Sequence, residues 1–178
     1  MATRELTVRA PMKVLNVVGT RPTFVKIAPL IAEMDRQSGL RPILVHTGQH
    51  YRDAMSDQFF SELGIRQPDF DLGVGSGPPA SQTAEIMKRI ESVMIDVRPD
   101  LVVVIGDEDS TLAAALTAVK LRLPVAHVDA GLRSFDRTMP EEINRVIIDA
   151  ISADFFVTEH SASLCINYTS SDRHQCQM

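Results

Sequence analysis

Two short apolar runs limit most strongly how this chain can fold. Residues 101–105 (LVVVI) are wholly apolar and rich in β-branched side chains, a pattern typical of a strand that is covered on both faces, as in a parallel sheet. Residues 124–128 (PVAHV) form a second such run. The apolar segment between the two runs predicts a buried helix with almost no polar face, capped by Asp109 or Ser110.

The same alternation of apolar strand and helix continues along the rest of the chain. Pro22 and Pro140 each suit the first position of a helix, and acids fill the first turn after Pro140. Further strands are predicted at residues 13–19, 42–48 and 155–158, and further helices at residues 22–34, 55–63, 86–97 and 140–151. Five strands, four of them linked through helices, predict an α/β fold with a doubly wound, Rossmann-like parallel sheet. Residues 66–81 form the longest loop, which is either a flap over a site or a plain connection.

Composition limits the class of protein. With 178 residues, 44% hydrophobic and 23% charged, we expect one ordinary domain with a proper core. The formal charge of −5 argues against a general nucleic-acid binder. No apolar run approaches the roughly 20 residues that span a bilayer, and the start lacks a signal peptide. We therefore expect a cytoplasmic protein with no membrane and no nucleic-acid partner.

The two ends of the chain carry little pattern. Residues 1–11 form a polar leader, residues 12–160 form the domain, and residues 161–178 are expected to be an irregular, poorly packed tail. The two cysteines, Cys165 and Cys176, lack a CxxC spacing. Neither a metal site nor a disulfide scaffold is therefore indicated.

Polar residues follow the predicted strands at the points where the strands end. Arg21, His50, Asp107, Asp129 and Glu159 each come after a separate strand. Taken singly, Arg21 can be a surface residue beside a helix cap and His50 a loop residue. Together they favour a site, because ligands of open α/β sheets bind outside the carboxyl ends of the strands.

Several motifs together resemble one enzyme family. GTRPTFVKIAPLI, TGQHYRDAMSDQFFSELGI, PDFDLGVGSG, PDLVVVIGD, STLAAALTAVKLRLPVAHVDAGLRSFDRTMPEEINR and TEHSA, over about residues 12–162, resemble the non-hydrolysing UDP-N-acetylglucosamine 2-epimerases in order and spacing. The resemblance implies one half of a glycosyltransferase-B-like fold, a homodimer, and conversion of UDP-GlcNAc to UDP-ManNAc without a metal or nicotinamide cofactor. The reaction implied is proton removal at C2 with anti elimination of UDP, then return of both to the other face.

The resemblance also implies roles for individual residues. Asp107, Asp129 and Glu141 match the family's catalytic acids, which suits a reaction that needs a positioned base and acid. The residues implied to bind the UDP-sugar are Arg21, His50, Arg133 and Arg145.

The sequence departs from the family pattern at three places, one of them the pair Glu108 and Asp109. Asp129 stands where the family has Glu, and a carboxylate that falls about 1 Å short can cost about 100-fold in rate. Glu108 and Asp109 add negative charge beside the acids, which can raise neighbouring pKa values or repel the pyrophosphate. Thr23 replaces a common Glu.

The length of the chain leaves the activity open. The family's second α/β domain is expected to be absent, so we expect a truncated epimerase. The alternative is a non-catalytic domain that associates with itself or is completed by a separate second half. Half of a glycosyltransferase-B-like transferase is less favoured, because three carboxylates suit proton abstraction better than sugar transfer.

Overall fold

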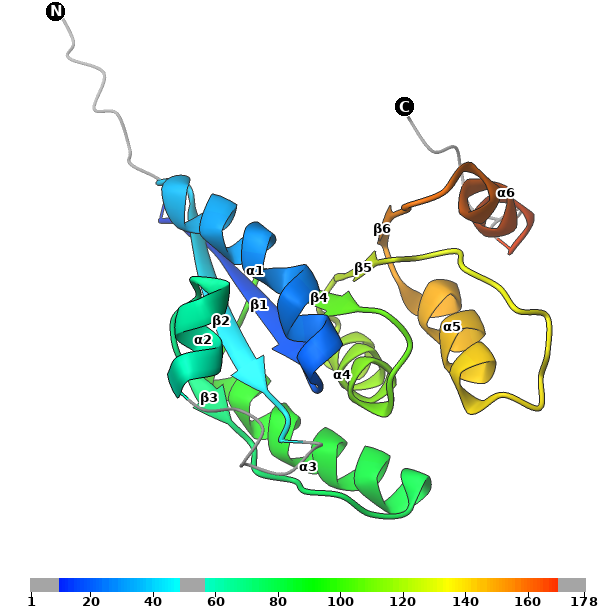
Figure 1. Ribbon diagram of the computed structural model, residues 1–178, viewed down its shortest axis with the longest axis horizontal. Coiled ribbons are helices and arrows are strands. Elements are labelled where there is room, and N and C mark those ends of the chain that lie inside the picture. The colour runs from blue at the N-terminus through cyan, green and yellow to red at the C-terminus, as the bar shows by residue number, and fades with distance from the viewer. Residues whose placement is uncertain (1–9, 49–56, 170–178) are drawn as a thin grey trace, which may run out of the picture.

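The computed structural model describes residues 10–48 and 57–169. Six parallel strands form one sheet in the order β3-β2-β1-β4-β5-β6 (Figure 1). The strands are β1 (Met12–Val18), β2 (Leu40–His46), β3 (Phe70–Asp71), β4 (Leu101–Ile105), β5 (Val125–Val128) and β6 (Asp154–Phe156). The helices are α1 (Arg21–Arg36), α2 (Asp57–Leu63), α3 (Pro79–Val97), α4 (Asp109–Lys120), α5 (Pro140–Ile151) and α6 (His160–Thr169). The predicted doubly wound parallel sheet is confirmed.

Helices cover both faces of the sheet. One core cluster joins the strands to α1 and α2 through Phe24, Ile27 and Phe60. The other joins them to α3, α4 and α5 through buried side chains that include Ile90 and Ile148. Figure 1 shows α1 and α3 on opposite sides of the strands. Because both faces are covered, the strands read as continuous apolar runs.

Strand β4 lies at the centre of the sheet, with β1 on one side and β5 on the other. Its side chains alternate between the two cores: Val102 and Val104 pack against α4, whereas Ile105 packs on the side of α1. The strand order changes direction between β1 and β4. Residues that follow these two strands therefore lie at the crevice where α/β sheets bind ligands.

Two local predictions were wrong. Residues 66–81, assigned to loop, contain strand β3, which pairs with the end of β2. Residues 161–169, assigned to an irregular tail, belong to helix α6. This helix is stabilised by two buried side chains four residues apart, Ala162 and Ile166. The rest of the predicted tail, residues 170–178, and residues 1–9 of the predicted leader lie outside the described residues.

Helix α6 packs directly against the loop that leaves β5. Gly131 in this loop has a φ of +78°, and a Cβ atom there would lie 2.3 Å from the Ala162 carbonyl oxygen. Only glycine fits such a position, since it lacks a Cβ atom and tolerates positive φ. Among the described helices, none is long and apolar enough to cross a membrane.

We expect Gly131→Ala to lower the free energy of unfolding by about 3 kcal/mol, because it adds both backbone strain and overlap with Ala162. Urea denaturation followed by circular dichroism measures the loss. Gly64→Ala is the matched control, since Gly64 has a φ of +65° but nothing within 4 Å of an added Cβ; strain alone costs about 1 kcal/mol. Equal losses in the two variants would contradict the packing of α6 on this loop.

Candidate functional site

Asp107 and Asp129 follow two adjacent strands at the same edge of the sheet. Ile105 pairs with Val128 at the ends of β4 and β5, and the Gly106 amide donates to the Val128 carbonyl at 3.0 Å. Each acid comes directly after this pairing. The structure therefore brings the exits of β4 and β5, which the sequence predicted to meet, to one rim.

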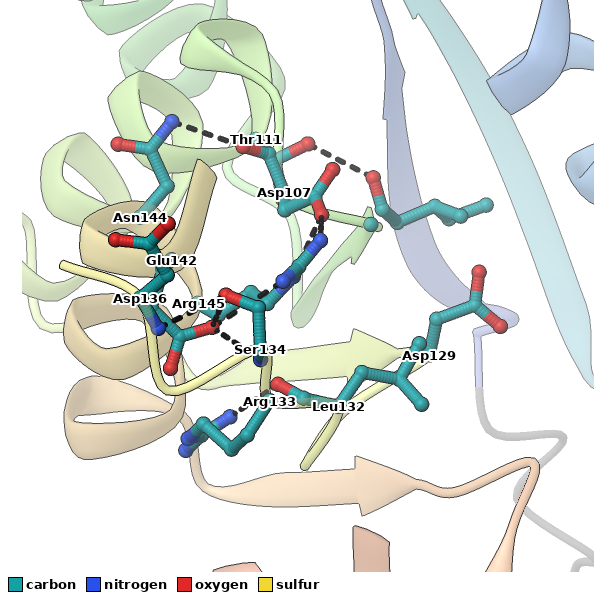
Figure 2. A network of polar contacts seen from close by, with 12 residues as sticks. Asp107, Thr111, Asp129, Leu132, Arg133, Ser134, Asp136, Glu142, Asn144 and Arg145 are labelled. Carbon is teal, nitrogen blue, oxygen red and sulfur yellow. Dashed lines mark hydrogen bonds and ion pairs between the residues drawn. The ribbon is translucent and has the colours of Figure 1, made fainter. Parts of the chain in front are cut away.

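Helix α5 is fastened to this rim through Asp107. The Arg145 guanidinium reaches the Asp107 carboxylate with Nε at 2.7 Å and Nη2 at 2.5 Å, and the Asn144 amide donates to the Asp107 carbonyl at 2.8 Å. Figure 2 shows the Arg145 side chain pointing toward the Asp107 carboxylate. Glu141 is exposed in the first turn of α5, four residues before Arg145, so it lies on the same side of the helix.

Glu142 is the acid in this region that sequence reasoning missed. It is buried, and its carboxylate accepts from the Ser134 amide at 2.8 Å and the Ser134 hydroxyl at 3.0 Å, with Arg145 Nη1 at 3.2 Å. Burial raises the pKa of Glu142, but the contacts with Ser134 and Arg145 outweigh burial and lower that pKa below its usual value. Its spacing of three residues from Arg145 is the signal that could have found it.

Asp129 is held by a lysine from the opposite side of the crevice. Lys26 Nζ of α1 lies 2.5 Å from Asp129 Oδ2. The backbone of Asp129 has a φ of +64°, a left-handed conformation that Asp and Asn adopt more readily than most residues. Sequence reasoning did not single out Lys26 as a site residue. Its place in the second turn of the helix that starts at this sheet edge could have marked it.

The switch point of the sheet carries Glu108. The Thr20 hydroxyl, after β1, donates to a Glu108 carboxylate oxygen, after β4. Burial raises the pKa of Glu108, the hydrogen bond from Thr20 opposes this, and neighbouring Asp107 raises the pKa further. The sequence predicted that the additional acids could raise neighbouring pKa values. The pKa that is raised is that of Glu108 itself.

Thr23 completes the turn that begins α1. Its hydroxyl accepts from the backbone amides of Gly19 at 3.3 Å and Thr20 at 3.2 Å, and donates to the Thr20 carbonyl at 2.8 Å. This reciprocal cap satisfies amides that a helix start otherwise leaves without partners. Arg21 follows at the first helical position and is exposed.

The remaining residues that the sequence predicted for the site are Arg133, Glu159 and His50. The Arg133 side chain is only 5% exposed and its Nη2 lies 2.7 Å from Asp149 Oδ2; its contact with substrate stays a prediction. Glu159 binds Ser161 at the start of α6. His50 lies outside the described residues. Within the described part of the chain, no group of three or more His, Cys, Asp or Glu side chains is arranged to hold a metal ion.

We expect Glu108→Gln to stabilise the fold at about pH 7 and to leave its stability unchanged at about pH 3.5. A carboxyl group whose pKa is raised on folding destabilises the native state increasingly as the pH rises above its unfolded value of about 4.3. Urea denaturation at the two pH values measures the difference. Glu85→Gln is the control, and its change in stability at about pH 7 is expected to have the opposite sign, because contacts with Arg89 and Lys88 lower the pKa of Glu85. A Glu108→Gln variant less stable than wild type at neutral pH would contradict this account.

Comparison with known proteins places this geometry in a family. The sequence model of the family UDP-N-acetylglucosamine 2-epimerase matches residues 32–169. A Methanococcus maripaludis protein described as a UDP-N-acetylglucosamine 2-epimerase homolog is 48% identical over 153 residues, covering 86% of this chain and 42% of that protein. The UDP-2,3-diacetamido-2,3-dideoxy-D-glucuronate 2-epimerase of Pseudomonas aeruginosa is 45% identical over 145 residues, covering 82% of this chain and 41% of its own length.

Solved structures agree with the sequence comparison. The crystal structure of Methanocaldococcus jannaschii UDP-GlcNAc 2-epimerase in complex with UDP-GlcNAc and UDP has a TM-score of 0.85 and 43% identity, covering 89% of this chain and 44% of that chain. A Streptomyces glycosyltransferase complexed with thymidine diphosphate, at 12% identity and a TM-score of 0.52, is similar in fold alone, which agrees with a glycosyltransferase-B-like half. The chain spans about two fifths of the length of the curated relatives it matches. It belongs to the UDP-N-acetylglucosamine 2-epimerase family.

Proposed function

We propose that this chain provides the acid-bearing half of the active site of a UDP-sugar 2-epimerase that interconverts UDP-GlcNAc and UDP-ManNAc. One observation carries the proposal: Asp107 and Asp129 leave adjacent strands at one rim, and Arg145 fastens the helix that bears Glu141 to Asp107. Three carboxylates on segments far apart in sequence thus share one edge of the sheet.

The chemistry requires a base, an acid and a cationic surface for the leaving group. One carboxylate removes the C2 proton, and the electrons of the C2–H bond form the C1–C2 double bond as the bond from C1 to the UDP oxygen breaks. A second carboxyl group returns a proton to the opposite face of C2, and UDP adds back to C1. Carboxyl groups are suited to both roles when the cleft sets their pKa values apart.

The departing pyrophosphate requires stabilisation of its developing charge. The start of α1 suits this need, because the Arg21 side chain and the helix dipole both favour an anion there. Lys26, which contacts Asp129, adds a second cation on the same helix. Arg145 neutralises Asp107 and Glu142 and so limits repulsion between the acids and the phosphates.

The substrates named for the relatives share one chemical group. The relatives include enzymes described as acting on UDP-GlcNAc and one described as acting on a UDP-diacetamido-glucuronate. A UDP-linked 2-acetamido sugar is shared by both, and UDP-GlcNAc is the candidate that the solved complex supports. Assembly as a homodimer stays a prediction from the family resemblance, and a cytoplasmic location stays a prediction from the sequence.

The proposed activity is tested with the chain alone and with a chimera that joins residues 12–162 to the remaining part of the M. jannaschii enzyme. Both are incubated with UDP-GlcNAc in deuterated water, and NMR follows UDP-ManNAc and deuterium at C2. Turnover by the chimera supports an epimerase half, and turnover by the chain alone shows that this half suffices. A chimera that folds but incorporates no deuterium at C2 would overturn the proposal, because the acids would then be inactive even beside an intact second half.

Asp107→Asn in the chimera is expected to lower kcat by about 10²-fold or more, as loss of a positioned acid or base does. Initial rates of UDP-ManNAc formation measure the effect. Asp100→Asn is the matched control at the amino end of the same strand, where Asp100 accepts only from the Lys13 amide. A similar loss in both variants would indicate damage to the fold instead of the site.

Asp129→Glu is expected to raise kcat of the chimera by as much as about 100-fold, because the added methylene restores the reach of the family's acid. The same change is expected to lower the unfolding free energy by about 1 kcal/mol, since Glu tolerates the left-handed backbone of this position less well than Asp. Kinetics and urea denaturation together separate the two effects. A lower kcat at unchanged stability would contradict the view that Asp129 is too short.

A further inference from the structure

A buried cluster of three ionisable side chains, His127, Asp149 and Arg133, lies behind the rim. His127 on β5 is 1% exposed, with Nδ1 at 2.7 Å from Asp149 Oδ1 and Nε2 at 2.8 Å from the Gly106 carbonyl. The other Asp149 oxygen, Oδ2, contacts Arg133 Nη2 at 2.7 Å and accepts from the Gly131 amide at 3.1 Å.

These contacts join the three segments that carry the candidate acids. Gly106 immediately precedes Asp107. Gly131 comes two residues after Asp129. Asp149 lies on α5, the helix that begins with Glu141. A shift of His127 or Asp149 would therefore be felt at all three segments of the rim.

The partners of His127 fix the orientation of its ring. The Gly106 carbonyl can only accept, so Nε2 donates to it. Nδ1 faces the Asp149 carboxylate at 2.7 Å. Burial raises the pKa of Asp149, but the contacts with His127 and Arg133 outweigh burial and hold that pKa below its usual value.

Four neighbouring segments of the chain surround His127. Helix α5 contributes Asp149, and the loop after β5 contributes Arg133 through Asp149. The residue that follows β4 contributes the Gly106 carbonyl, and β6 pairs with β5 through the backbone of Phe155. The imidazole ring and the guanidinium thus share one carboxylate.

We propose that His127 is a positioning residue: its ring ties the exit of β4 to α5 and, through Asp149, to the exit of β5, and so sets the spacing of Asp107 and Asp129. Its part in epimerisation rests on the proposed function. The tethering is a property of the chain itself and is tested without turnover.

The first test uses the intact 178-residue chain with ¹⁵N-labelled histidine. NMR records the proton on Nε2 of His127, the nitrogen that lies 2.8 Å from the Gly106 carbonyl. We expect this proton to exchange slowly with water, because it is buried and hydrogen-bonded. A ring whose Nε2 carries no proton, or whose Nε2 proton exchanges as fast as that of an exposed histidine, would overturn the proposal.

The second test separates the two tethers with a matched pair of variants. A glutamine amide can replace Nε2 and an asparagine amide can replace Nδ1, so His127→Gln keeps the bond to Gly106 and His127→Asn keeps the bond to Asp149. Amide hydrogen exchange is expected to accelerate roughly tenfold or more at Gly131 in the Gln variant, and amide shifts to change at Asp107 in the Asn variant.

Thr117→Val is the control for this pair, because Thr117 is buried on α4 and binds only the Ala113 carbonyl. It is expected to lower stability while leaving the amides of Asp107 and Gly131 unchanged. The same pattern of change in both His127 variants, or no change at either exit, would contradict the positioning role. Neither test of His127 measures turnover. Both can therefore be interpreted even if the chain has no epimerase activity.

Discussion

The parallel pairing of β4 with β1 and β5 is the constraint on which the rest of the structure depends. It forces every polar residue that follows these strands to the same edge of the sheet, however far apart the residues lie in sequence. Helix α4 makes the pairing possible, because its small buried side chains, including Ala114 and Ala118, pack closely against the strands. Without this close packing, Asp107 and Asp129 would not share a rim.

The negative charge gathered at this edge is balanced by cations from different elements. Arg145 contacts Asp107 and Glu142, and Lys26 contacts Asp129. Removing one partner of a buried ion pair leaves an uncompensated charge, which costs more than the pair contributes. This applies to Glu142, which is buried beside Arg145, and to Asp149, which is buried with His127 and Arg133 in the core.

The sequence predicted the features that follow from the pattern of single strands and helices. The strand Leu101–Ile105 was recognisable because both of its faces are buried. The shared edge then followed from the expectation that the strands run parallel. Strand β3 was missed because two residues show no periodicity. Helix α6 was missed because Ala162 and Ile166 are the two buried side chains among residues 161–166. The place of Lys26 on α1 could have marked it as a site residue, but its partner Asp129 and the partners of Asp149 were not predictable, since these contacts join separate elements whose approach only the fold determines.

The departures from the family pattern become intelligible as one set. Glu108 adds an acid, but burial favours its protonated form, so it adds less negative charge to the crevice than the sequence suggests. Thr23 takes over the capping of α1. Asp129 occupies a left-handed position with Lys26 against its carboxylate, a backbone that suits Asp better than Glu. Asp thus suits the backbone at position 129 better than Glu does, but its carboxylate extends less far from the backbone.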